Sequence, residues 1–83
     1  STNPLHSVVH RPAHYAGFSI DPVTFIMTNN MEFWRGNIVK YACRAGRKMY
    51  DGMSKMDSEI VDLEKARRYA EMRINELRSK LPL

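Results

Sequence analysis

The sequence has a single cysteine, Cys43, and no long run of apolar residues. One cysteine excludes an intramolecular disulfide framework and a cysteine-rich zinc site. The apolar runs span only a few residues, far short of the roughly 20 that cross a bilayer. The first residues also lack the charged start and apolar block of a signal peptide. We therefore expect a cytoplasmic protein with no membrane partner.

The chain is also short, which limits the core that it can build. Its 83 residues allow one domain, and a domain of this size buries about 60–65% of the surface that its unfolded form exposes. The composition, 43% hydrophobic and 27% charged, is that of a globular domain and not of a disordered chain. Because no disulfide reinforces so small a domain, we expect it to gain stability as a homo-oligomer.

Acidic residues are absent from the stretch between residues 35 and 48, where five bases lie. These bases are Arg35, Lys40, Arg44, Arg47 and Lys48. The whole chain carries +4 at pH 7, from 13 bases and nine acids, so the remaining eight bases and nine acids give −1 elsewhere. The excess positive charge is confined to one segment. It indicates either an anionic partner, such as a nucleotide or nucleic acid, or a solvated basic helix face.

No segment alternates convincingly between apolar and polar residues as a half-buried strand does, so we predict an all-α fold. Residues 1–20 contain two prolines and little periodicity, and we expect them to form an irregular N-terminal arm. Residues 21–83 form the predicted helical domain. The chain is thus predicted to be a single domain of about three helices preceded by an arm.

The three helices are predicted from signals at their ends. The first occupies residues 22–28, where an aspartate-proline pair supplies a cap and a suitable first residue. The second occupies about residues 31–45 and closes at Gly46. The third lies between Ser54 and Pro82 and carries an apolar stripe at helical spacing. The stripe consists of Ile60, Leu63, Ala66, Ala70, Ile74, Leu77 and Leu81.

Polar side chains gather on the predicted second helix. Spacings of three and four residues place Asn37, Lys40 and Arg44 together, and the chain then turns at Gly46 into two more cations. Arginine can fork two hydrogen bonds onto phosphate oxygens, and lysine supplies a compact charge. We interpret this segment as a phosphate clamp, with a solvated basic face as the alternative. It is not a P-loop, because the paired glycines of that motif are absent.

A second polar line, formed by Asp62, Lys65 and Tyr69, lies beside the apolar stripe. An acid and a base three residues apart usually form a surface ion pair, but Asp62 could also orient a cation or accept a hydrogen bond from a sugar hydroxyl. Glu59 and Asp62 form an acidic pair that can hold Mg²⁺, yet the other helices lack the further carboxylates that such a site needs. The three histidines of the arm are spaced by four, but Pro12 interrupts them, so we expect no metal site there.

Three blocks of residues follow one another along the chain. They are Pro12-x-His14-Tyr15, then Gly36-Asn37-Ile38-x-Lys40-Tyr41-x-x-Arg44-Ala45-Gly46-x-Lys48, and then Asp62-Leu63-x-Lys65-Ala66-x-x-Tyr69. In this order they resemble a family of small phage proteins, long catalogued as a domain of unknown function, that includes the nucleotide kinase of short-tailed coliphages. The resemblance covers about residues 11–75, and its middle block is the most specific.

The resemblance implies a deoxynucleoside monophosphate kinase that uses a nucleoside triphosphate in the cytoplasm of an infected bacterium. As cofactor we expect Mg²⁺ together with ATP. The residues carried over by motif are His14, Tyr15, Asn37, Lys40, Tyr41, Arg44, Lys48, Asp62, Lys65 and Tyr69. Of these we expect Lys40, Arg44 and Asp62 to act in catalysis. The others, together with Arg47, are expected to bind the nucleotide and its phosphates.

Two alternatives stay open at this point. The kinase member of the family has an additional N-terminal region, and without it this chain would bind and sequester a nucleotide or a nucleotide signal. A basic helix also suits nucleic acid or a host protein, although the chain has no recognised nucleic-acid-binding signature. Because one small subunit can hardly enclose two nucleotides, we expect a site shared within a homo-oligomer.

Overall fold

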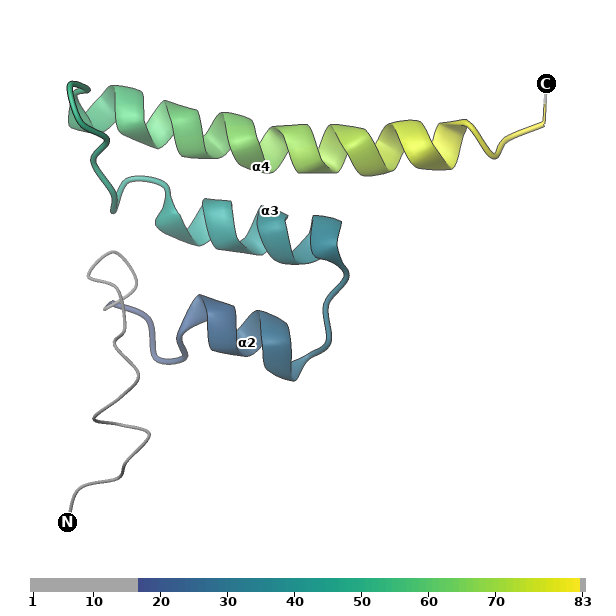
Figure 1. Cartoon of the computed structure of the whole chain (residues 1–83), viewed down its shortest axis with the longest axis horizontal. Helices are drawn as coiled ribbons and strands as arrows, with labels where there is room; N and C mark the ends of the chain where they lie inside the picture. The colour runs from purple at the N-terminus through teal and green to yellow at the C-terminus, as the bar shows by residue number, and fades with distance from the viewer. Residues whose placement is uncertain (1–16, 83) are drawn as a thin grey trace, which may run out of the picture.

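The computed structural model describes residues 17–82, which form three helices and no strand. Helix α2 spans Pro22–Thr28, α3 spans Phe33–Arg44 and α4 spans Lys55–Arg78 (Figure 1). The predicted all-α fold is confirmed for this part of the chain. Most of the predicted arm, with His14 and Tyr15, lies outside the described residues, so the division into arm and domain stays a prediction. None of the described helices is both long and apolar enough to cross a membrane.

The helix ends follow local signals in the sequence. Asp21 caps α2, because its Oδ2 accepts a hydrogen bond from the backbone N–H of Thr24 at 3.2 Å. Ser54 caps α4 in the same way, with the N–H of Asp57 3.0 Å from its Oγ. Helix α3 has no side-chain cap and begins two residues later than predicted. After it the chain reverses at Gly46, whose φ of +81° lies in the region that favours glycine.

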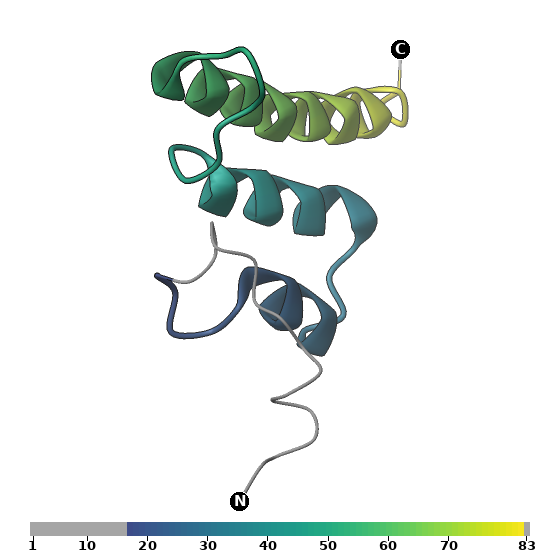
Figure 2. The ribbon, with the colours of Figure 1, turned by 60° about the vertical axis from the view of Figure 1, so that its left-hand side comes forward.

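Helix α3 packs against both α2 and α4, and successive helices run in opposite directions (Figures 1 and 2). Gly36 permits the close approach of α2, because a Cβ added there would lie 2.7 Å from Cγ2 of Ile26. The ring of Trp34 in α3 contacts two arginines, Arg35 of the same helix and Arg73 of α4. Their guanidinium carbons lie 4.5 and 5.4 Å from the ring centroid. Helix α4 has 24 residues against 12 in α3, and its C-terminal end, after Arg73, extends past α3 (Figure 1).

The face of α4 that packs on α3 is polar. The buried residues of α4 are Ser58 and Asp62, both on the polar side of the helix. The apolar stripe predicted from periodicity is present, but its large members, such as Leu63 and Leu77, are exposed. An apolar stripe ordinarily faces the core of its own domain. In the single chain the apolar stripe instead remains exposed to solvent, and α3 and α4 are joined by a network of polar and aromatic side chains.

Candidate functional site

Asp62 lies at the centre of this network. It projects from α4 with 0% of its surface exposed, and its Oδ1 accepts hydrogen bonds from Oη of Tyr50 at 2.6 Å and Nε of Arg44 at 3.3 Å. Arg44 ends α3 and Tyr50 lies in the loop that follows, so three segments of the chain meet at one carboxylate. A buried carboxylate needs a counter-charge, and Arg44 supplies it. The second oxygen, Oδ2, receives no hydrogen bond from residues 17–82.

The hydroxyl of Tyr50 connects this carboxylate to a second cation. Besides donating to Asp62, it accepts hydrogen bonds from Nη2 of Arg44 at 2.9 Å and Nζ of Lys65 at 3.1 Å. The backbone N–H of Tyr50 donates to Oγ of Ser58 at 2.9 Å, which fixes the loop on α4. These hydrogen bonds form one network that connects the loop to α3 and α4, so each hydrogen bond supports the geometry of the others.

Cations also surround the ring of Tyr41. Lys40 Nζ and the guanidinium carbon of Arg44 each lie 4.6 Å from its centroid, and Lys65 Nζ lies 5.2 Å away. Distances below about 6 Å are those of cation–π contacts. The ring of Tyr69 in α4 stacks on Tyr41, with the centroids 6.0 Å apart and the planes 10° from parallel. Tyr41 is therefore held between the helices by an aromatic neighbour and three charged ones.

The ring of Tyr50 is a second aromatic platform, with Lys48 Nζ at 4.8 Å and Lys65 Nζ at 4.9 Å from its centroid. We refer to the residues around the two rings as the cationic cluster. It consists of Lys40, Tyr41, Arg44, Lys48, Tyr50, Asp62 and Lys65. Four bases stand against one acid here, so the cluster concentrates positive charge at one end of the helix pair.

The four cations differ in what balances their charge. Burial works against the charge of Arg44, but attraction by Asp62 and by the phenols of Tyr50 and Tyr41 outweighs it, so the pKa of the Arg44 guanidinium lies above its usual value. Arg44 is thus firmly charged and paired. Lys40 and Lys48 lie over aromatic rings and form no ion pair within the described residues. These two lysines are the side chains best placed to meet an anionic ligand.

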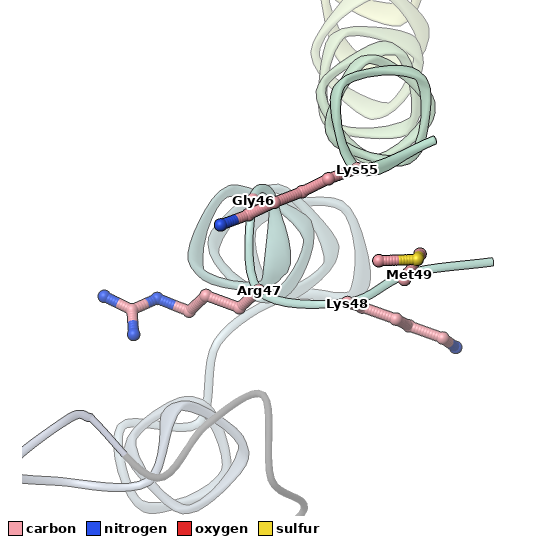
Figure 3. A pocket seen from close by; sticks show the side chains of 5 residues that line it. All are labelled: Gly46, Arg47, Lys48, Met49 and Lys55. Carbon is pink, nitrogen blue, oxygen red and sulfur yellow. The ribbon is translucent and has the colours of Figure 1, made fainter. Parts of the chain in front are cut away.

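A pocket of about 260 Å³ lies beside the cluster, at the end of α3. Its lining residues are Gly46, Arg47, Lys48, Met49 and Lys55 (Figure 3). The side chains of Arg47 and Lys55 extend to one side of the loop, and Lys48 extends to the other (Figure 3). The guanidinium of Arg47 packs over the ring of Phe18 at 4.3 Å. Lys48 therefore links the pocket to the cationic cluster, whereas Arg47 faces the segment before α2.

The structure brings most of the predicted site residues together. Lys40, Tyr41, Arg44, Lys48, Asp62 and Lys65 lie in the cationic cluster, and Tyr69 stacks against it. Asn37 lies apart, because its buried amide donates to the backbone oxygen of Phe33 at 2.8 Å within α3. Arg47 is also separate, as described above. His14 and Tyr15 fall outside residues 17–82.

Two members of the network, Tyr50 and Ser58, were not among the sequence predictions. Tyr50 is the only aromatic residue between residues 45 and 68, in a segment with no helical period to place it. Ser58 stands four residues before Asp62 and so shares its face of α4. That spacing was the available signal for Ser58. For Tyr50 the sequence offers only its isolation among polar residues and methionines.

Acidic residues do not gather into a metal site in the described part of the chain. No three His, Cys, Asp or Glu side chains there come close enough together to hold a metal ion. Glu59 is exposed and lies against the end of α3, where its Oε1 is 3.3 Å from the position of a Cβ added at Gly46. Asp62 instead points into the helix pair. The two carboxylates of the predicted acidic pair therefore have different surroundings.

Comparison with known proteins identifies a family but no activity. The model of a family described as "protein of unknown function (DUF3310)" matches residues 9–71. The matched range includes all of the cationic cluster and ends within α4. No curated protein and no solved structure matches the chain.

Proposed function

The chain belongs to the DUF3310 family of proteins of unknown function, and we propose that it binds nucleotide phosphates at the cationic cluster. The observation that carries this proposal is the pair of lysines, Lys40 and Lys48, which lie over aromatic rings without a carboxylate partner in the described residues. Lysines meet phosphate as point charges. The rings of Tyr41 and Tyr50 are already in contact with cations of the cluster, and Tyr41 also with Tyr69, so the surface provides contacts for the phosphates of a nucleotide and not for its base.

The activity that we propose is phosphoryl transfer between nucleotides, which rests on the resemblance of the three sequence blocks to the phage family with a nucleotide kinase. A phosphate oxygen of a deoxynucleoside monophosphate would attack the γ-phosphorus of ATP. The bond from that phosphorus to the β,γ-bridging oxygen would break, giving a deoxynucleoside diphosphate and ADP. Such a reaction needs chiefly positioning and charge neutralisation. A Mg²⁺ ion would enter on the triphosphate, which supplies the oxygen ligands that it prefers.

Within this proposal, Asp62 and Arg44 are positioning residues. Asp62 is fully buried and Arg44 is paired with it, so neither meets a ligand as the structure stands. Together with Tyr50 they hold Lys65 and the ring of Tyr41 in place. The groups assigned to direct contact with phosphates are Lys40, Lys48 and Lys65. This assignment moves the catalytic role expected for Arg44 and Asp62 to the lysines around them.

The test is a product assay on the full chain. The protein would be incubated with ATP and each deoxynucleoside monophosphate, with and without Mg²⁺, and the products separated by ion-pairing chromatography. Binding would be followed in parallel by calorimetry. Lys48→Gln is expected to lower nucleotide affinity by about tenfold to a hundredfold, since a hydrogen bond to a charged group contributes about 1.5–3 kcal/mol. Arg35→Gln removes the same charge from an exposed position of α3 outside the cluster and should change affinity less than twofold.

The outcomes separate the candidate functions. A diphosphate product that is lost in Lys48→Gln supports the kinase. Nucleotide binding with no product after long incubation supports sequestration by the same site. A single-stranded oligonucleotide that binds far better than a mononucleotide, with affinity falling steeply as salt rises, would replace the nucleotide proposal with nucleic-acid binding. No binding of any of these ligands by folded protein would remove the cationic cluster as a phosphate site.

A further inference from the structure

Helix α4 carries an apolar seam that has no partner in the described chain. We define the α4 seam as Met56, Ile60, Leu63, Arg67, Ala70, Ile74, Leu77 and Leu81. The spacings between successive members alternate strictly between four and three residues. This is the pattern by which a helix in a two-stranded coiled coil meets its partner. Only Arg67 interrupts the apolar character, and Leu81 lies just beyond the end of the helix.

The seam is open to solvent along its length. Met56 is 73% exposed, Leu63 48% and Leu77 47%. Scattered exposed apolar residues are ordinary on a protein surface, but a continuous row of them marks an interaction site. Helix α3 does not cover the row, because it packs on the face that carries Asp62, about 100° around the helix from Leu63. The single chain therefore leaves a complete coiled-coil face unpaired.

The charges beside the seam identify the partner. Four acids flank its first part, and three bases flank its second part. The acids are Asp57, Glu59, Glu64 and Glu71, and the bases are Arg73, Arg78 and Lys80. Two parallel copies would set Glu59 against Glu64 and Arg73 against Arg78, which are like charges. Two antiparallel copies instead set Asp57 against Arg78 and Glu59 against Lys80, and their one like pair, Glu64 against Glu71, lies beside Arg67.

We infer that α4 pairs with α4 of a second copy of this chain as an antiparallel coiled coil. One register fills every layer of the seam. Ile60 meets Leu77 of the partner subunit, and Leu63 meets Ile74 of the partner subunit. The same register sets Asp57 opposite Arg78 of the partner subunit. The C-terminal end of α4, which extends past α3, thereby gains a neighbouring helix.

Arg67 fits the centre of this pairing. Its guanidinium already lies 3.8 Å from Glu64 and 3.7 Å from Glu71 on the same helix. In the antiparallel register it faces the small side chain of Ala70 of the partner subunit, which leaves room for it. The two arginines at the centre would share four carboxylates. The two central layers thus each hold one arginine and one alanine, and polar residues at such core positions fix the register of a coiled coil.

The first test is the oligomeric state of the full chain, which does not depend on the ligand of the cationic cluster. Sedimentation equilibrium across a wide concentration range is expected to give twice the chain mass of 9.7 kDa. Leu63→Glu should give a monomer that remains helical by circular dichroism. Met72→Glu is the matched control, because Met72 is an exposed residue of α4 outside the seam, and it should remain dimeric. A wild-type chain that stays monomeric at the highest concentrations would overturn the inference.

The second test fixes the orientation by disulfide formation in a Cys43→Ala background. In the antiparallel register the two copies of residue 60 lie 17 residues apart along the helix, or about 26 Å. A disulfide needs Cα atoms closer than about 7 Å. Ile60→Cys chains mixed with Leu77→Cys chains should therefore cross-link, while neither variant alone should. Cross-linking of Ile60→Cys alone would show a parallel pair, and an absence of cross-links in the mixture would exclude this register.

Discussion

The hydroxyl of Tyr50 donates a hydrogen bond to Oδ1 of Asp62 at 2.6 Å. A residue of the loop between α3 and α4 thus completes the polar centre of the helix pair. Its backbone N–H is bonded to Ser58 as well, so the loop is held to α4 at two points. Tyr50 therefore both attaches the loop to α4 and orders the residues of the cationic cluster.

Tyr50→Phe removes that hydroxyl and leaves Asp62 short of a donor. We expect the free energy of unfolding to fall by about 1–3 kcal/mol, because the buried carboxylate loses one of its two hydrogen-bond donors. Urea denaturation measures this loss. Tyr69→Phe is the control, since the Tyr69 hydroxyl has no hydrogen bond within residues 17–82, and it should change stability by less than about 0.5 kcal/mol. Equal stability of Tyr50→Phe and the wild-type chain would contradict the network.

Asp62→Ala should be more damaging, because it leaves the Arg44 side chain, which is only 13% exposed, without its counter-charge. Breaking one side of a buried ion pair costs about 3–5 kcal/mol, which approaches the whole stability of a small domain. Thermal unfolding measures the effect, and Asp51→Asn at an exposed loop position should leave the melting temperature nearly unchanged. The double change Arg44→Met with Asp62→Leu removes both charges and should recover part of the loss. A stable Asp62→Ala variant would mean that the pair is dispensable.

Gly36→Ala tests the contact between α2 and α3. The added Cβ would lie 2.7 Å from Cγ2 of Ile26, so the Ile26 side chain or its helix must shift. Overpacking of this kind costs about 1–3 kcal/mol, partly offset by a gain of about 1 kcal/mol because alanine favours the helix. Chemical denaturation should show a net loss of stability. In an Ile26→Ala background the same change should become neutral or stabilising, and a loss that persists there would have another cause.

Cys43 should react slowly with alkylating agents. Burial raises the pKa of its thiol, against the opposing effect of Arg47, so less thiolate is present at a given pH. Iodoacetamide rates measured from pH 7 to 11 are expected to show a midpoint above 9.0, the ordinary thiol value. Arg47→Gln removes the opposing charge and should move the midpoint further upward. Urea-unfolded protein gives the reference, and a folded midpoint below that reference would contradict the burial of the thiol.

Local signals were sufficient to predict the helices. Each of these signals acts within a few residues: the aspartate-proline pair at the start of α2, the serine before α4 and Gly46 after α3. The helix end beside each signal lies within about two residues of its expected position. Packing is not local. Periodicity identified the apolar stripe of α4, but it could not tell whether that stripe faces its own domain or another chain.

The candidate site was predicted only in part, because local spacing does not determine which segments pack together. Spacing along a helix correctly grouped Lys40 with Arg44, and Asp62 with Lys65. It also grouped Asn37 with the first pair, but the amide of Asn37 is taken up by a backbone oxygen of its own helix. Tyr50 lies in a loop, where no periodicity applies. Its role depends on where the chain returns after Gly46, which only the three-dimensional structure supplies.

Trp34 gives the molecule a built-in optical reporter. It is the only tryptophan of the chain, and it lies between Arg35 and Arg73 where α3 meets α4. Its emission will therefore respond when these two helices separate. The α4 seam is on a different face and approaches Trp34 only through Arg73, so dissociation of two copies should change the emission much less than unfolding does. Fluorescence and sedimentation together can distinguish loss of the fold from loss of the pairing in one titration.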